Sequence, residues 1–252
     1  MDNMKLFEVL QIMIRQIGGS KYNKHFVLKG GSALMTLLLE SNKENLFRKT
    51  SDIDLHVDSA EIWREFKSNV ESILNSNPYG AIFSVISSRD KSEVSDSITL
   101  QADYSGGSDK VKIDMNVGVF STITMAYLPT LGINSYDCET MLVDKINAVS
   151  SQKIFRRIKD LYDICAISQL KNYSSADILK HIEVKRPEFF TDGKNMLVPE
   201  NIDNLEHAYS QYRGISMKPK FELVLNLCIN FLEPFYLRIE NVVWNGEKWI
   251  KQ

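Results

Sequence analysis

Two carboxylates stand two positions apart in the stretch Asp52-Ile53-Asp54-Leu55, where polar and apolar residues alternate. This alternation predicts a strand, and its period of two places Asp52 and Asp54 on one face while Ile53 and Leu55 point into the core. Neighbouring acids repel each other unless a cation lies between them. Because Mg²⁺ takes carboxylate oxygens together with substrate phosphates as ligands, the pair is a candidate site for Mg²⁺ or Mn²⁺.

A second candidate feature comes earlier in the chain. The short apolar run 26–28 predicts a buried strand, and Gly30-Gly31-Ser32 follows it, with Ser32 as the expected N-cap of a helix that ends near Leu39. The unpaired N–H groups of a helix N-terminus attract phosphate, and two glycines let the backbone approach a ligand closely. The turn is therefore a candidate phosphate-binding site.

A third acid comes from a later strand. In the stretch 111–119, Lys112, Asp114 and Asn116 alternate with apolar residues, which predicts that they share one face. Three acids, a phosphate-binding turn and a divalent cation would make a site for phosphoryl transfer. Each feature alone is more often a plain turn or a solvated strand face, so their co-occurrence in one chain is what favours the functional interpretation.

The elements that must hold these residues follow an α/β pattern up to about residue 136. Apolar residues at helical spacing predict a helix at 5–17 and a second one whose apolar stripe runs from Ile62 to Leu74, with Ser59 as its expected N-cap. Alternating stretches predict further strands at 81–87 and 97–104, the latter paired antiparallel with 111–119 through a turn at 105–108.

From residue 137 onward the pattern changes to a helical one. Helices are expected at 141–149, 158–170, 176–183, 205–212 and 221–232. The prolines that separate or end them are Pro187, Pro199, Pro219 and Pro234. We therefore expect an N-terminal α/β domain over residues 1–136 and a mainly helical domain over residues 137–252.

The net charge of the protein gives it no overall electrostatic attraction to nucleic acid. The 252 residues include 30 Lys+Arg and 32 Asp+Glu, a formal net charge of −2. Nucleic-acid binding must then come from a local patch. The candidates are Lys153, Arg156, Arg157 and Lys159, whose alternative interpretation is a solvated basic face.

Cysteine usage and hydropathy indicate the class of protein. The three cysteines, Cys138, Cys165 and Cys228, are widely spaced and read as buried thiols in a reducing compartment. No apolar run reaches the 18 residues that a membrane helix needs, and the N-terminus has no signal-peptide pattern. We expect a cytoplasmic protein without a membrane partner.

Four pieces of the chain, in order, resemble a known family. The pieces are Lys29-Gly30-Gly31-Ser32-Ala33-Leu34, Arg48-x-x-Ser51-Asp52-Ile53-Asp54-Leu55, Asp144-Lys145-Ile146-Asn147-Ala148 and Lys159-Asp160-Leu161-Tyr162-Asp163-Ile164. Together they resemble the AbiEii-type toxin branch of the polymerase β-type nucleotidyltransferase superfamily. The resemblance implies an α/β (α+β) nucleotidyltransferase fold, in which helices flank a mixed β-sheet, followed by a helical domain.

The resemblance also implies roles for individual residues in the N-terminal part. Gly30, Gly31 and Ser32 would bind the phosphates of a nucleotide, and Asp52 and Asp54 would hold the metal. Asp114 matches the third acid of the superfamily, a further metal ligand that deprotonates the attacking hydroxyl, although no distinctive motif surrounds it.

Two further roles fall in the helical domain. Lys145 would contact the triphosphate or act in proton transfer, and Asp160, with Asp163 as a second candidate, would position Lys145 or the nucleotide. The domain over residues 137–252 would thus contribute Lys145 and Asp160 to the site.

The implied activity is a metal-dependent transfer of NMP from an NTP to a hydroxyl, most simply the 3′ end of an RNA such as tRNA. Arg156, Arg157 and Lys159 would contact that RNA. The family context implies the toxin of a toxin–antitoxin or abortive-infection system, with a cognate antitoxin encoded nearby. A small-molecule acceptor, a protein side chain as acceptor, and a catalytically silent binding protein with the same fold remain alternatives.

Overall fold

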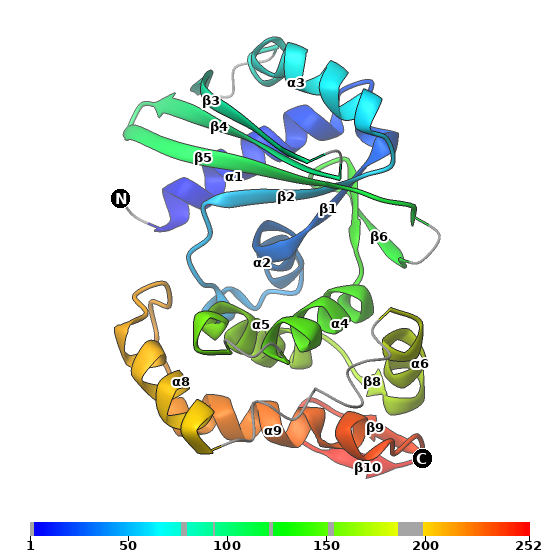
Figure 1. The fold of residues 1–252 in the computed structure, drawn as a ribbon. Coiled ribbons are helices and arrows are strands. Elements are labelled where there is room, and N and C mark those ends of the chain that lie inside the picture. The colour runs from blue at the N-terminus through cyan, green and yellow to red at the C-terminus, as the bar shows by residue number, and fades with distance from the viewer. Residues whose placement is uncertain (1–2, 77–79, 93, 121–122, 151–153, 186–198) are drawn as a thin grey trace. The chain divides into compact units, whose positions relative to one another are not determined.

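The chain forms two compact units in the computed structural model, which describes residues 3–76, 80–92, 94–120, 123–150, 154–185 and 199–252 (Figure 1). The first unit comprises residues 1–37 and 49–137, and the second comprises residues 38–48 and 138–252. The segment 38–48, which the sequence pattern placed in the N-terminal domain, thus belongs by its contacts to the second unit.

A seven-stranded mixed sheet forms the centre of the first unit, with the strand order β3-β4-β5-β2-β1-β7-β6. The strands are β1 (Phe26–Lys29), β2 (Asp52–Val57), β3 (Ala81–Ser92), β4 (Ser95–Tyr104), β5 (Gly107–Val117), β6 (Met125–Leu128) and β7 (Ile133–Tyr136). Strand β2 runs parallel to β5 and antiparallel to β1, and β1 runs parallel to β7. The predicted mixed sheet with flanking helices is confirmed.

Three helices accompany this sheet: α1 (Asn3–Gly18), α2 (Gly30–Glu40) and α3 (Ala60–Leu74). Helices α1 and α3 pack on each other and on the sheet. The Ser59 side chain accepts hydrogen bonds from the N–H groups of Glu61 and Ile62, so the N-cap of α3 forms as the sequence predicts. Phe66 packs edge-on against Phe26 of β1, with ring centroids 4.9 Å apart, which anchors α3 to the strand that precedes the glycine turn.

The start of α2 differs from the prediction. The helix begins at Gly30, two residues before Ser32, so the expectation that Ser32 is its N-cap was wrong. Gly30 has a positive φ of 68°, a conformation that glycine adopts without a steric penalty. The turn from β1 into α2 is therefore made at Gly30 itself.

The strands beyond residue 80 are longer and more numerous than predicted. Pairing of β4 with β5 continues to Tyr104 opposite Gly107, so the expected turn shortens to the two residues between them. Strand β3 extends to Ser92, whose partner is Ser95. The polar end of β3 and the four-residue strands β6 and β7 show too little alternation of polar and apolar residues to be recognised in the sequence. They belong to the sheet because their backbones pair with neighbouring strands.

The second unit contains all five expected helices and a small sheet that was not expected. The helices are α4 (Cys138–Val149), α5 (Ile158–Ser168), α6 (Ser175–Lys185), α8 (Pro199–Gln211) and α9 (Phe221–Leu237). The sheet has the order β10-β9-β8, with β8 (Tyr173–Ser174), β9 (Val242–Trp244) and β10 (Trp249–Lys251). Segment 38–48 includes a short 3₁₀ helix, η2 (Glu44–Leu46).

Helix α9 continues through a proline that was expected to follow it. Pro234 lies inside the helix, which ends five residues later than predicted. Phe231 and Phe235 on this stretch pack against Trp249 with centroid distances of 5.7 and 5.6 Å. Burial of these rings stabilises the last turns despite the backbone hydrogen bond that proline removes.

The cysteines are free thiols. Cys165 and Cys228 are buried as expected, with their Sγ atoms 3.2 Å apart, whereas Cys138 is only half-buried, so the expectation of a third core thiol was wrong. Within the described ranges, no helix combines the length and apolar character needed to cross a bilayer.

Candidate active site

Three carboxylates gather on one face of the central strands. Asp52 and Asp54 are half-buried on β2, while Ile53 between them is completely buried, so the predicted alternation is confirmed. Asp54 is in register with Asp114 of the parallel strand β5. Because register partners in neighbouring strands project from the same face, Asp114 joins the pair there.

The glycine turn lies directly against this acidic face. A Cβ atom added to Gly30 would stand 2.1 Å from Oδ2 of Asp54, closer than any real contact allows. Only glycine at this position leaves space for the Asp54 carboxylate. Asp54 is therefore placed beside the N-terminus of α2, whose free N–H groups favour negatively charged ligands.

Ser32 ties α2 to β2. Its side chain is fully buried, and its hydroxyl donates a hydrogen bond to the main-chain carbonyl of Asp52. Gly31 is also buried. The structure thus gives the Ser32 hydroxyl a partner within the protein, and its contact with phosphate stays a prediction.

Two lysines share the face with the acids. Lys112 is in register with Asp52, and its Nζ lies 2.5 Å from Oδ2 of Asp114. Lys29 is in register with Asp54 and donates to Oδ1 of Asn116 at 2.9 Å. Sequence alternation had placed Lys112 on this face but assigned it no role, and only the strand register shows that it is paired with an acid.

The donor set suits a divalent cation that also binds substrate. Within the described part of the chain, no group of three or more Asp, Glu, His or Cys residues is arranged to hold a metal ion. Mg²⁺, however, is held in enzymes by one or two carboxylates, with water and substrate phosphates completing its shell. Asp52 and Asp54 offer only oxygen atoms and are partly exposed, so their chemistry fits such an ion.

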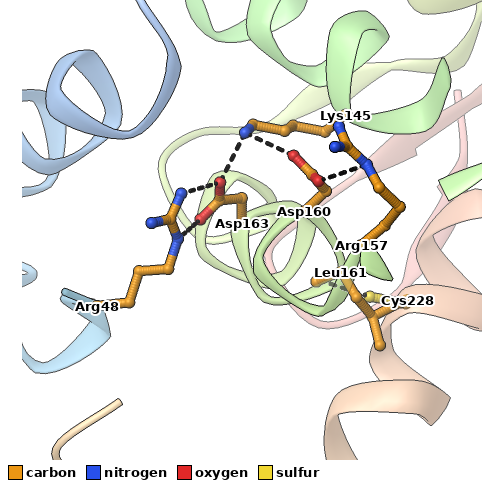
Figure 2. A network of polar contacts seen from close by, with 7 residues as sticks. All are labelled: Arg48, Lys145, Arg157, Asp160, Leu161, Asp163 and Cys228. Carbon is orange, nitrogen blue, oxygen red and sulfur yellow. Dashed lines mark hydrogen bonds and ion pairs between the residues drawn. The ribbon is translucent and has the colours of Figure 1, made fainter. Parts of the chain in front are cut away.

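A separate charged cluster lies in the second unit (Figure 2). Nζ of Lys145, on α4, lies 2.8 Å from Oδ1 of Asp160 and 2.8 Å from Oδ2 of Asp163, both on α5. The expected contact between Asp160 and Lys145 is therefore present. Arg157 closes the other side of Asp160, with Nε 2.9 Å from Oδ2.

Arg48 completes this cluster; it lies in one of the four sequence motifs but was assigned no role there. Its Nε and Nη2 donate to the two carboxylate oxygens of Asp163 at 2.6 and 2.7 Å, and the side chains are 4% and 0% exposed (Figure 2). A bidentate pair of this kind is both strong and geometrically specific. Local sequence signals could not reveal its pairing with Asp163, because the two residues are 115 positions apart.

The charges in the cluster support one another. Burial alone would lower the pKa of Lys145, but the carboxylates of Asp163 and Asp160 outweigh it and hold the pKa above its usual value. Burial would raise the pKa of Asp163, but Arg48 and Lys145 lower it to about 2. Lys145 is therefore a fixed cation at neutral pH.

The predicted RNA-contacting residues differ in their surroundings. Arg156 and Lys159 are exposed, whereas Arg157, also exposed, is paired with Asp160. Lys153 lies outside the described residues. Their surroundings do not assign these side chains to a nucleic acid, so their role stays a prediction.

A family model decides the identity of the chain. The model described as nucleotidyl transferase AbiEii toxin, type IV toxin–antitoxin system, matches residues 11–226. The chain belongs to this family. The protein is accordingly a nucleotidyltransferase, and its family implies an NTP as substrate and an antitoxin as partner.

Solved structures share the fold of this AbiEii-family protein. JHP933 from Helicobacter pylori superimposes with a TM-score of 0.64 at 12% identity, over 94% of this chain and 93% of the other. A proposed nucleotidyltransferase from H. pylori gives a TM-score of 0.62 at 12% identity, over 94% and 95%. None of the curated proteins compared with the chain matches it. At this identity the likeness shows the fold alone.

Proposed function

We propose that this AbiEii-family nucleotidyltransferase transfers NMP from an NTP to the 3′ hydroxyl of an RNA, with tRNA as the first candidate. The reaction forms a bond between the acceptor oxygen and the α-phosphorus and breaks the bond to the β-phosphate, so pyrophosphate leaves and the hydroxyl proton passes to a base. In this proposal the protein is the toxin of a type IV toxin–antitoxin pair.

The observation that carries the proposal is the position of Asp54. Its carboxylate lies against Gly30 of the turn, and Asp54 is in register with Asp114 of β5, with Asp52 on the same face. A phosphate at the N-terminus of α2 would thus lie next to carboxylates that can share a cation with it.

Each residue near the turn has a proposed task. Asp52 and Asp54, with Asp114 as a third candidate ligand, would hold Mg²⁺ or Mn²⁺, which stabilises the charge that develops on the transferred phosphate. Gly30 and Gly31 present main-chain N–H groups to the phosphates. Asp114 would also accept the proton of the attacking hydroxyl, for which a half-buried carboxylate on this face is suited.

Lys145 has a proposed task as a cation. Its two carboxylate partners keep it protonated and restrict its position. We assign to it the phosphate-binding role rather than proton transfer, because an ammonium with a raised pKa gives up its proton poorly at neutral pH. Asp160 and Asp163 are then its positioning residues.

The proposal is tested by incubating the purified protein with total cellular RNA, a divalent cation and each α-labelled NTP in turn. Label should appear on a small RNA. Asp54→Asn, which keeps the size of the side chain, should reduce incorporation at least about a hundredfold. Asp103→Asn is the matched control, because Asp103 is an exposed acid of the same sheet, and it should keep full activity.

Other results would redirect or overturn the proposal. Label on a protein, or on a small molecule added as acceptor, would replace RNA while keeping the nucleotidyltransferase site. Incorporation into RNA that is equal in Asp54→Asn and in the wild type would refute the assigned site. Binding of an NTP without transfer to any acceptor would support a silent binding protein instead.

A further inference from the structure

The acidic face of β2 and β5 already carries a cation of its own. Lys112 of β5 is in register with Asp52 and contacts Asp114 at 2.5 Å. The side chain of Lys112 is 37% exposed and that of Asp114 is 23% exposed. Solvent reaches both side chains, so the ion pair can separate. Because both are also partly buried, water only partly screens the attraction between the ammonium and the carboxylate.

This contact competes with a bound metal. Asp52, Asp54 and Asp114 place three negative charges on one face, and the ammonium of Lys112 compensates part of that charge. A divalent cation at the same carboxylates would be repelled by the ammonium and would need an oxygen that Lys112 now holds. Lys29, the other lysine of this face, donates instead to Asn116.

We propose that Lys112 is an internal counter-ion of this site, which keeps its metal affinity low until a nucleotide binds. The inference rests on the proposed function, since it takes the carboxylates to be metal ligands. Before a nucleotide binds, Lys112 acts only through its contact with the acids.

Nucleotide phosphates provide the alternative partner for Lys112. A lysine ammonium is a compact charge on a flexible four-carbon stem, so it can exchange a carboxylate for a phosphate nearby. When it does so, Asp114 is released to the metal, and the metal and the nucleotide bind better together than apart. Thermodynamic linkage requires this coupling to be the same in either order of binding.

The test measures Mn²⁺ affinity directly, from the electron paramagnetic resonance signal of free Mn²⁺, with and without a non-hydrolysable NTP analogue. Lys112→Met keeps an unbranched side chain, one atom shorter than lysine, but removes its charge. Without nucleotide, this variant should bind Mn²⁺ about fivefold more tightly than the wild type, the size expected for loss of one half-exposed ion pair. The enhancement of Mn²⁺ binding by the analogue should shrink by the same factor.

Three companion variants make the comparison specific. Lys112→Arg keeps the charge and should bind Mn²⁺ as the wild type does, and Lys112→Gln should repeat the effect of Lys112→Met with a polar side chain. Lys110→Met is the matched control, because Lys110 is an exposed lysine on the same strand, in register with Gln101 rather than with an acid. Circular dichroism establishes that each variant is folded.

The outcomes separate this inference from the proposed function. Mn²⁺ binding that Asp54→Ala abolishes, but that is equal or weaker in Lys112→Met than in the wild type, would overturn the counter-ion role alone. Absence of Mn²⁺ binding in both the wild type and Lys112→Met, even with the analogue, would overturn the metal site and the inference together. Tighter binding in Lys110→Met of the same size would also overturn it, because the effect would then be a general one of charge.

Discussion

Single atoms decide the geometry of the acidic face. At Gly30 the missing Cβ makes space for Oδ2 of Asp54, and the positive φ turns the chain from β1 into α2. At Ser32 one hydroxyl fixes the first turn of α2 to the carbonyl of Asp52. A substitution at Gly30 therefore has two separable effects, on the backbone and on the carboxylate.

Gly30→Ala tests the effect on the Asp54 carboxylate. Its control is a glycine at which alanine would disturb only the backbone. Gly80 also has a positive φ, of 84°, but a Cβ there would meet nothing within 4 Å. Gly80→Ala should lose about 1 kcal/mol of unfolding free energy, because the left-handed conformation disfavours a side chain, and Gly30→Ala should lose at least as much because it also displaces Asp54. Only Gly30→Ala should lose activity, by about tenfold or more, since it displaces Asp54.

Urea unfolding and the labelled-NTP assay measure these two quantities. Equal activity of both alanine variants would show that the position of the Asp54 carboxylate against the turn is unimportant for the reaction.

Elements of the second unit are held together by buried charge rather than by apolar packing alone. Arg48 from segment 38–48, Lys145 from α4 and Asp163 from α5 meet in one network. Removing one member of a buried ion pair leaves its partner without compensation and costs about 3–5 kcal/mol. Asp163→Asn should therefore destabilise the protein by that amount at neutral pH, whereas Asp203→Asn, at an exposed acid of α8, should not.

The stabilisation by Asp163 should depend on pH in a defined window. Its pKa is about 2 in the folded protein, below the value near 3.9 of an unfolded chain. A lowered folded-state pKa contributes stability that is complete above about pH 4 and is lost as the pH falls toward 2, where the folded carboxylate also gains its proton. The contribution is on the order of 2–3 kcal/mol.

Urea unfolding of the wild type and Asp163→Asn between pH 2 and pH 7 measures this dependence. The gap in unfolding free energy between the two proteins should narrow as the pH falls below 4. A gap that stays constant over this window would mean that Asp163 is not held ionised by Arg48 and Lys145.

At the scale of the whole molecule, near-neutral charge limits how RNA can be bound. With a formal net charge of −2, affinity for RNA must depend on a few local cations. Arg156 and Lys159 are exposed, so the double variant Arg156→Gln/Lys159→Gln should weaken RNA binding several-fold. It should also reduce the slope of log affinity against log salt concentration by about two.

Filter binding at several KCl concentrations measures both effects, with Lys180→Gln as a control at an exposed lysine of α6. An unchanged slope in the double variant would place the RNA contacts elsewhere. If the double variant also kept full activity on a small-molecule acceptor, the alternative in which the acceptor is a small molecule rather than RNA would gain support.

The sequence by itself determined the local structure and the family. Alternation of period two placed Asp52 and Asp54 on one face of β2, and helical spacing predicted the five α-helices seen in the described residues of the second unit. These signals are local, because a strand or helix imposes its period on adjacent residues whatever lies around it. The four ordered motifs, which also depend only on neighbours in sequence, identified the AbiEii family that the family model confirms.

Only the tertiary structure decided which distant residues meet. The register of β2 with β5 sets Asp54 beside Asp114 and Asp52 beside Lys112, and no period within either strand fixes that register. The pair of Arg48 and Asp163 likewise joins residues 115 positions apart. Such contacts form when elements pack, because burying an ion is favourable only where the complete fold supplies its partner.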